Sequence, residues 1–204
     1  MNIICKAGHW DRDPGRVTGE FIEHELAKKV VEELKLLLPG AVYVPTSLSL
    51  REAIQWVNKR VEPGDLAVET HFNSNNDPNM RGTEAYYSEN SRLAGLFSQK
   101  VSEALGVPNR GPKHDSTSYV GSLGWLRNLK CQSVLIEACY LTNKEDTRAL
   151  DVKKIALGIK NAIDILNWKP EEKIQELRIQ QISLLQRILA ELQRQLNRLL
   201  GKPI

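Results

Sequence analysis

Three side chains that could bind a metal ion or transfer a proton lie in or directly after short apolar segments. His9 follows the apolar segment 2–5, His71 lies near the end of segment 65–73, and Glu137 comes immediately after residues 134–136. A carboxylate beside a buried strand costs free energy unless it is paired, protonated or functional. Open α/β sheets bind ligands beyond the carboxyl ends of their strands. We therefore expect these three residues to meet at one edge of a sheet.

Glu23 is the fourth candidate, because it lies inside the apolar stripe of a predicted helix over residues 20–38. At about 100° per residue, six apolar side chains of this helix fall within about 60° of Glu23. Those side chains are Leu26, Ala27, Val30, Leu34, Leu37 and Leu38. Glu25 and His24 point elsewhere, and Glu20, at the margin of the stripe, is the second choice.

His9, Glu23 and His71 form a set of two histidines and one carboxylate. Three protein ligands with one open position are typical of a catalytic zinc site. Zinc lowers the pKa of water and polarises a carbonyl, and Glu137 is placed to take the proton and deliver it to a leaving amine. The residues therefore predict metal-assisted amide hydrolysis.

Each of these residues also has a structural interpretation. A histidine at a strand end often makes only ordinary hydrogen bonds. Glu23 suits a helix N-terminus because the helix dipole favours a carboxylate there. Glu137 could form an ion pair with Arg127 or Lys130. The metal site is favoured because it explains all four residues together.

The elements that must position these residues alternate between strands and helices. Apolar segments predict strands over residues 2–5, 41–44, 65–73, 82–88 and 134–137. Amphipathic periodicity predicts helices over residues 20–38, 50–61, 91–106 and 144–166, with Asn143 as N-cap of the last. This alternation predicts an α/β domain, residues 1–168, with a twisted, mostly parallel sheet and helices on both faces.

The composition excludes several classes of protein. The 204 residues are 41% hydrophobic, and no apolar run reaches the length of a transmembrane span. Of 28 Lys and Arg and 25 Asp and Glu, seven and four lie in residues 169–204, so residues 1–168 are neutral. A neutral domain argues against nucleic acid as the substrate. Cys5, Cys131 and Cys139 lack metal-binding spacing and are expected to be reduced thiols.

The C-terminal segment, residues 169–204, has a different pattern. Pro170 suits the first turn of a helix, and residues 171–200 contain no Gly or Pro. Apolar residues then recur every three or four positions, at Ile182, Leu185, Leu189, Leu192, Leu196 and Leu199. This seam predicts a coiled-coil-like amphipathic helix that makes the chain a homo-oligomer through residues 174–200. The alternatives are packing against residues 1–168, or binding of this basic helix to wall polymers or a membrane surface.

Six motifs resemble those of the zinc-dependent N-acetylmuramoyl-L-alanine amidases, the family of bacterial autolysins and phage endolysins. They are AGHWDRDPG, EHELAKKVVEEL, ETHFNS, GTEAYYS, NRG and VLIEACYLTNKED, and they span nearly all of residues 2–166. The resemblance implies that His9, Glu23 and His71 bind Zn²⁺ and that Glu137 is catalytic, as the residues themselves suggest. It also implies the substrate, peptidoglycan, and the bond, the amide between the lactyl group of N-acetylmuramic acid and L-alanine of the stem peptide.

The turn around His9 departs from the pattern of this family. Lys6 and Ala7 replace the usual Asp-Pro before Gly-His, and Trp10 and Asp11 replace the usual Gly pair after it. The predicted ligand is retained. The shape of this turn, and substrate selection near Trp10, are left open.

Three further residues are candidates for binding the substrate. Asn73 lies two residues after His71, on the same face of a strand, although it could equally cap a loop. Arg110 and His114 lie in a predicted loop, residues 109–119, and could contact a carboxylate of the stem peptide.

The N-terminus begins as a strand and lacks the features of a secretory signal. With no recognisable wall-binding repeat, this favours a phage-type endolysin that is made in the bacterial cytoplasm and reaches the wall when the host lyses. A bacterial enzyme released by mother-cell lysis is the alternative. Two other functions stay open: a zinc peptidase with another substrate, and a non-catalytic wall-binding protein, which would have no use for Glu137.

Overall fold

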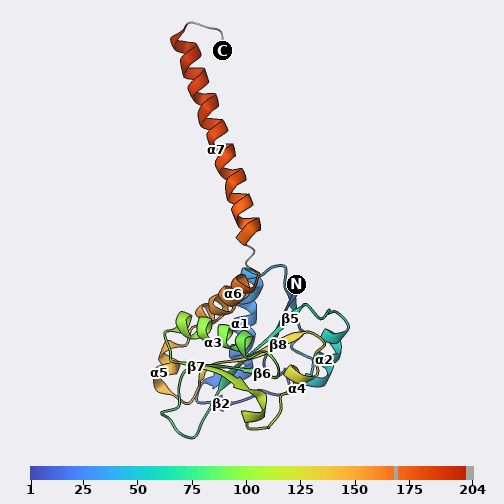
Figure 1. Cartoon of the computed structure of the whole chain (residues 1–204). Coiled ribbons are helices and arrows are strands. Elements are labelled where there is room, and N and C mark those ends of the chain that lie inside the picture. The colour runs from blue at the N-terminus through green and yellow to red at the C-terminus, as the bar shows by residue number, and fades with distance from the viewer. Residues whose placement is uncertain (168–169, 201–204) are drawn as a thin grey trace. The chain divides into compact units, whose positions relative to one another are not determined.

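The computed structural model describes the backbone of residues 1–167 and 170–200, and the side chains of residues 1–167 and 178–200. The chain divides into two compact units, Met1–Leu166 and Asn167–Ile204. The first holds a sheet with its helices, and the second holds one long helix, α7 (Pro170–Leu199) (Figure 1). Within the described residues, no helix has both the length and the hydrophobicity that crossing a membrane requires.

A six-stranded mixed sheet, in the order β4-β1-β5-β8-β6-β7, forms the centre of the first unit. Its strands are β1 (Ile3–Ala7), β4 (Val42–Tyr43), β5 (Leu66–Asn73), β6 (Thr83–Tyr87), β7 (Asn109–His114) and β8 (Gln132–Tyr140). Strands β4, β1, β5 and β8 are parallel, whereas β6 is antiparallel to β8 and parallel to β7. The predicted α/β fold with a mostly parallel sheet is confirmed.

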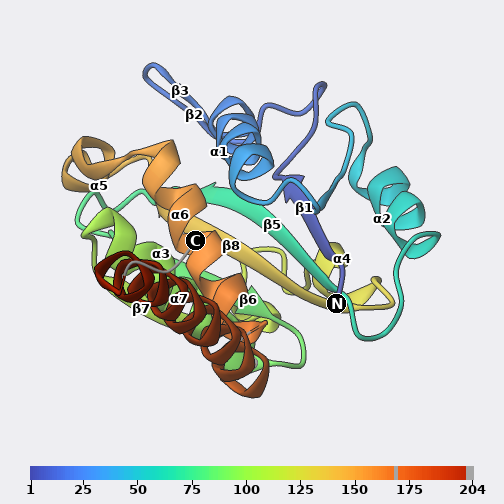
Figure 2. The ribbon, with the colours of Figure 1, turned by 90° about the horizontal axis from the view of Figure 1, so that it is seen from above.

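Helices cover both faces of the sheet (Figure 2). Ile3 and Cys5 of β1 belong to a large hydrophobic cluster that includes residues of α1 (Glu23–Leu37), α3 (Ser91–Leu105) and α6 (Val152–Leu166). Ile4 belongs to a smaller cluster with residues of α2 (Leu50–Asn58) and α4 (Gly124–Arg127). Because successive strand residues point to opposite faces, the two clusters lie on opposite sides of the sheet.

Three helices differ from their predicted bounds, and one of them, α2, ends at Asn58 and not at residue 61. Helix α1 begins at Glu23, three residues later than predicted, because Phe21 and Ile22 form β3 and pair with β2 (Val17–Thr18). The helix predicted over residues 144–166 is two helices, α5 (Lys144–Ala149) and α6. Asn143 caps the shorter one, since its side chain accepts hydrogen bonds from the backbone N–H groups of Glu145 and Asp146 at 2.9 and 3.0 Å.

The prediction of a loop over residues 109–119 is wrong for its first half. Residues Asn109–His114 form β7, followed by a 3₁₀ turn at Asp115–Thr117. Gly111 and Pro112 favoured a loop, but β7 lies at the edge of the sheet, where a proline without an N–H costs little pairing. Arg110 and His114 therefore lie on a strand.

Helices α3 and α6 approach each other closely at Gly158. A Cβ atom built there would lie 2.7 Å from the carbonyl oxygen of Lys100 and 2.7 Å from Cα of Val101. Real Cβ atoms do not come so near to backbone atoms. The absence of a side chain at this position therefore sets the separation of the two helices.

We expect Gly158→Ala to lower the free energy of unfolding by about 1–3 kcal/mol, because overpacking forces the helices apart. Gly95→Ala on α3 is the matched control. Its Cβ would meet only Pro112, at 3.7 Å, so the better helix propensity of Ala should raise stability by about 0.5–1 kcal/mol. Urea denaturation of both variants tests this, and equal stability of the two would contradict the close-packing argument.

Candidate active site

Three elements bring side chains that could bind a metal ion together beside the carboxyl ends of β1 and β5. His9 lies in the turn after β1, Glu23 is the first residue of α1, and His71 lies in β5. One candidate ligand atom from each residue lies within 4.8 Å of the other two. Glu20, the second choice from the sequence, is exposed in the hairpin of β2 and β3.

Glu23 lies between the two histidines. Its Oε2 is 3.0 Å from Nε2 of His9, and its Oε1 is 2.9 Å from Nδ1 of His71. The backbone N–H groups of Arg16 and Phe72 donate to the same carboxylate at 2.9 and 3.1 Å. Burial opposes the ionisation of Glu23, but the hydrogen bonds with the histidines outweigh it and lower its pKa. The cluster therefore contains a fixed negative charge, as a cation site requires.

The two histidines bind protons more tightly than usual in the absence of a metal ion. Burial favours neutral His71, but the charge of Glu69 and the hydrogen bond with Glu23 outweigh it and raise the pKa of His71 well above its ordinary value. The hydrogen bond with Glu23 likewise raises the pKa of His9 against the effect of burial. Since histidine binds a metal in its neutral form, an incoming cation must displace these protons.

The turn that carries His9 is held in an unusual backbone conformation. His9 has φ of 61°, in the left-handed region that non-glycine residues rarely adopt. His24 supports the turn, because its Nδ1 donates to the carbonyl oxygen of Gly8 at 2.7 Å. A Cβ atom on Gly8 would lie 2.7 Å from the ring of His71, and one on Gly15 would lie 2.5 Å from Nε2 of His9. These two glycines let the histidines approach Glu23.

Glu137 lies next to this cluster. The sequence predicted that its strand ends at Glu137, but β8 continues to Tyr140. His71 and Glu137 are register partners in the parallel pair of β5 and β8. Oxygen Oε2 of Glu137 is buried and has no hydrogen-bond partner among the described residues. Arg127, one possible ion-pair partner, binds Asp115 instead, with Nε and Oδ2 2.5 Å apart. The carboxyl group is thus available for a substrate.

The surroundings of Glu137 favour its protonated form. Burial raises its pKa to about 8 against an opposing effect of His71, and the carboxylates of Glu23 and Glu84 act in the same direction as burial. A carboxyl group whose pKa lies near neutrality can both accept and deliver a proton. This is the property required of a general acid and base.

Two of the predicted substrate-binding residues converge on Glu84, which lies opposite Glu137 in the antiparallel pair of β6 and β8. The side-chain amide of Asn73 donates to one oxygen of Glu84 at 2.9 Å. Nε of Arg110 donates to the other oxygen at 2.7 Å. Tyr86 also donates its hydroxyl to Glu84, at 3.1 Å. Asn73 and Arg110 are therefore fixed beside the unpartnered carboxyl group.

His114 has different neighbours. Its Nδ1 lies 2.7 Å from the hydroxyl of Ser116, and its ring packs edge-on against Tyr87, with the centroids 5.4 Å apart. The side chain is 41% exposed. It does not belong to the group of described residues that could hold a metal ion, His9, Glu23 and His71.

Sequence reasoning did not single out three carboxylates of this site. Oδ2 of Asp13 lies 2.9 Å from Nδ1 of His9, and Oε2 of Glu69 lies 3.4 Å from Nε2 of His71. Glu84 is the third. The signals were present: Asp13 lies four residues after His9 in one turn, and Glu69 lies two residues before His71, on the same face of a strand.

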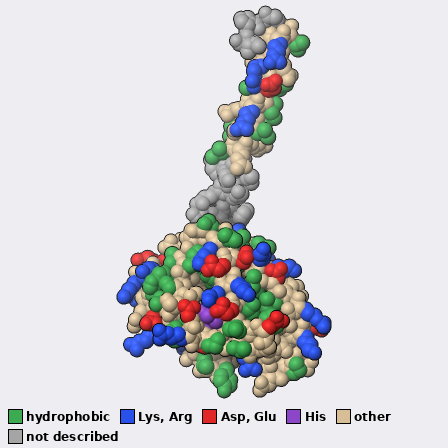
Figure 3. Space-filling model, turned by 180° about the vertical axis from the view of Figure 1, so that it is seen from behind, with side chains coloured by type: hydrophobic (Ala, Val, Ile, Leu, Met, Phe, Trp, Pro, Cys, Tyr) green, Lys and Arg blue, Asp and Glu red, His purple; other side chains and the backbone are tan. Residues whose placement is uncertain are grey.

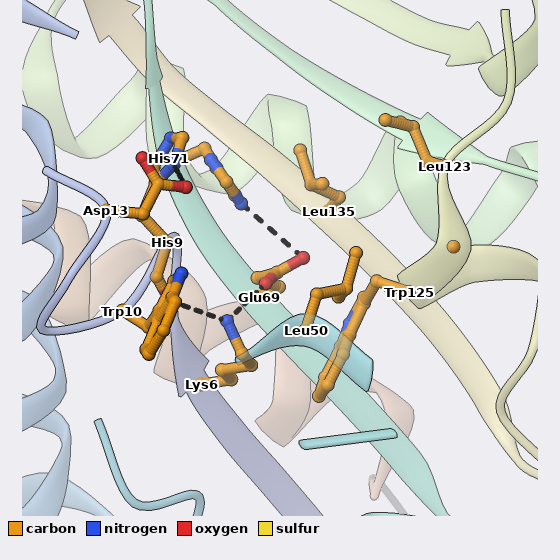
Figure 4. A pocket seen from close by; sticks show the side chains of 11 residues that line it. Lys6, His9, Trp10, Asp13, Leu50, Glu69, His71, Leu123, Trp125 and Leu135 are labelled. Carbon is orange, nitrogen blue, oxygen red and sulfur yellow. Dashed lines mark hydrogen bonds and ion pairs between the residues drawn. The ribbon is translucent and has the colours of Figure 1, made fainter. Parts of the chain in front are cut away.

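A pocket of about 240 Å³ opens beside His9 and His71 (Figure 4). Lys6 and Glu69 line its polar side, and the apolar lining includes Leu50, Leu123, Trp125 and Leu135. Figure 3 shows histidine at the surface of one face of the molecule, among acidic and basic side chains. His9 and His71 therefore reach the pocket, while Glu23, Glu69 and Glu84 are buried.

Solved structures of bacterial cell-wall enzymes share this fold. The catalytic domain of CwlV, an N-acetylmuramoyl-L-alanine amidase from Bacillus (Paenibacillus) polymyxa var. colistinus, superposes with a TM-score of 0.71 at 21% identity, over 83% of this chain and 100% of that one. AmiC2 of Nostoc punctiforme gives 0.70 at 21% identity, over 82% and 98%. The catalytic domain of the CD27L endolysin, which targets Clostridia difficile, gives 0.61 at 23% identity, over 80% and 96%. At these identities the likeness shows the fold.

The sequence match is to a family model. Curated protein sequences give no significant match. Residues 3–164 match the model of the N-acetylmuramoyl-L-alanine amidases, and that region includes every residue of the site described above. The chain therefore belongs to the N-acetylmuramoyl-L-alanine amidase family and is an enzyme that acts on peptidoglycan.

Proposed function

We propose that this amidase cleaves the bond between N-acetylmuramic acid and L-alanine with Zn²⁺ held by His9, Glu23 and His71, and with Glu137 as general base and acid. The observation that carries the proposal is the buried, unpartnered carboxyl oxygen of Glu137 beside the three metal-binding side chains. A structural carboxylate at such a place would have a partner.

The donor atoms suit zinc. Two imidazole nitrogens and a carboxylate are common protein ligands of Zn²⁺, and catalytic sites supply three such ligands. Zn²⁺, when bound, polarises a carbonyl group and lowers the pKa of water. Glu23 is anionic and lies between the nitrogens of His9 and His71, so one cation could replace the hydrogen bonds that now join them.

The chain's own residues then handle the protons and the orientation of the substrate. Glu137 accepts a proton from the attacking water at its free oxygen and delivers it to the leaving nitrogen of L-alanine. Asn73 and Arg110 orient the stem peptide, because Arg110 uses only Nε on Glu84 and keeps other N–H groups for a carboxylate. His114 stays a predicted contact of the stem peptide.

The competing functions differ in what they require of the site. A wall-binding protein without activity has no use for a carboxyl group of raised pKa next to a metal cluster. A peptidase would use the same chemistry on a different bond, so the products decide. The predicted phage-type endolysin role stays a prediction, since the similar structures include bacterial amidases as well as an endolysin.

For α7 we propose self-association with a second copy of the chain. Its six seam residues, from Ile182 to Leu199, are 47–85% exposed and follow the three- and four-residue spacing of a coiled coil. Figure 3 shows hydrophobic and basic side chains along the described part of this helix. An identical helix presents the same seam in the same register, which makes a second copy the best-matched partner.

We expect Glu23→Gln to weaken Zn²⁺ binding by more than about 100-fold, because it removes the anionic ligand. Loss of a partner that only orients a ligand costs up to roughly 100-fold. Competition with a chromophoric chelator measures the affinity. Glu25→Gln is the matched control: it removes the same charge from the same helix, but at an exposed position, and should bind as the wild type does. Equal affinities of the two variants would contradict the ligand assignment.

On purified peptidoglycan, we expect stem peptides that begin with L-alanine, identified by mass spectrometry. A chelator should abolish their release and added Zn²⁺ should restore it. Glu137→Gln should reduce the rate by about 10²–10⁴-fold with Zn²⁺ binding retained, because only the proton transfer is lost. Fragments cut within the peptide would indicate a peptidase, and full activity of Glu137→Gln would exclude the proposed general base.

Sedimentation of the full-length chain tests the proposal for α7. Leu185→Glu together with Leu192→Glu should convert the oligomer to a monomer, because both charges enter the seam. Gln186→Glu together with Gln193→Glu adds the same charge outside the seam and should leave the oligomer intact. A monomeric wild type would favour the alternative functions of this helix. Binding of the wild type to anionic vesicles would do the same if the control variant no longer binds them.

A further inference from the structure

Both histidines of the metal site have a carboxylate on their second nitrogen. Nε2 of His9 and Nδ1 of His71 face Glu23. The opposite nitrogens face Asp13, at 2.9 Å from His9, and Glu69, at 3.4 Å from His71. A histidine that binds a metal commonly donates its other N–H to a carboxylate, which fixes the tautomer and the orientation of the ring. His9 and Asp13 form a hydrogen bond of this kind, and His71 and Glu69 form an ion-pair contact at the corresponding nitrogen.

The two carboxylates are held very differently. Asp13 is half exposed and belongs to the same turn as His9. Glu69 is only 2% exposed, and its Oε1 accepts a hydrogen bond from the ammonium group of Lys6 at 2.7 Å. Figure 4 shows this pair beside His71 in the pocket. A buried carboxylate that is fixed in this way can hold a ring in a single orientation.

Lys6 also connects Glu69 to the other half of the site. Its Nζ donates to the carbonyl oxygens of Ala7 and His9, at 2.8 and 3.1 Å. All three N–H bonds of the ammonium group are therefore used within the protein, and none is left for a substrate. The contacts run from the backbone of the His9 turn through Lys6 and Glu69 to the ring of His71.

Stability alone does not explain a buried ion pair here. Replacing such a pair with apolar residues of similar size is often neutral or stabilising, because burial of two charges costs about as much as their attraction returns. The pair does, however, satisfy a requirement of the histidine beside it. His71 must present Nδ1 toward Glu23 with its proton on Nε2, and an acceptor at Nε2 enforces that arrangement.

We propose that Glu69, anchored by Lys6, is a positioning residue that holds His71 in the tautomer and orientation that bind the metal ion. This inference rests on the proposed function, because it assumes that His71 is a ligand. Glu69 itself touches neither the substrate nor the ion in this role. Its contribution should therefore appear in the affinity for metal even when no peptidoglycan is present.

The test uses two double variants of the full-length chain, so that no buried charge is left without a partner. In Lys6→Met with Glu69→Leu, His71 has no acceptor at Nε2. In Lys6→Met with Glu69→Gln, the amide oxygen can still accept from it. We expect the leucine variant to bind Zn²⁺ about 10–100-fold more weakly than the wild type, with unchanged or higher resistance to urea. The glutamine variant should recover most of the lost affinity.

Co²⁺ provides a second measurement that does not depend on activity. Its visible absorption spectrum reports the geometry of the ligands, so the leucine variant should show a shifted spectrum and the glutamine variant a spectrum like that of the wild type. Arg127→Met with Asp115→Asn is the matched control. It removes another buried carboxylate and its cation, with Nε and Oδ2 2.5 Å apart, and should leave Zn²⁺ affinity unchanged.

Wild-type affinity and spectrum in a folded leucine variant would overturn this inference and leave the proposed function intact. If the wild type bound no divalent metal, both this inference and the proposed function would fail. An equal loss of affinity in the Asp115 control would also overturn the inference, because the effect would then follow from the loss of any buried carboxylate with its cation and not from the contact with His71.

Discussion

The carboxylate of Glu23 joins three parts of the chain that are distant in sequence. It lies between His9, in the turn after β1, and His71, in β5, and it also accepts the backbone N–H of Phe72. Its position depends on the small hairpin of β2 and β3, whose pairing delays the start of α1 until Glu23. The first residue of the helix thus reaches the edge of the sheet, and the site exists only when hairpin, helix and sheet are all formed.

The alternation of strand side chains assigns the two faces of the sheet to different tasks. One face packs against α1, α3 and α6 in the larger hydrophobic cluster, which contains Cys5, Val68 and Ile136. The neighbours of these residues, Lys6, Glu69 and Glu137, point to the opposite face, where the cluster with α2 and α4 is smaller. A polar pocket can open there while the core remains intact on the other side.

Carboxylates outnumber cations around this site. Glu23, Glu69, Glu84 and Glu137 lie on adjacent elements, and Asp13 contacts His9. Among the residues described, Lys6 and Arg110 form ion pairs with two of these carboxylates. Such an arrangement attracts a cation, and the same negative surroundings help to keep Glu137 protonated until one binds.

Much of this protein follows from the sequence. Apolar periodicity indicated the strands, the helices and the place of Glu23 in a helical stripe, since spacing along one element fixes which side chains share a face. The motifs identified the family and four candidate residues for the chemistry. The sequence did not indicate where α1 begins or that residues 109–114 form a strand, because pairing with other segments decides both. Nor did it reveal that Asp13 and Glu69 face the second nitrogens of the histidines, or that Arg110 and Asn73 share Glu84. Contacts between distant segments depend on strand order and register, and only the tertiary structure, which brings β1, β5, β6 and β8 side by side, determines them.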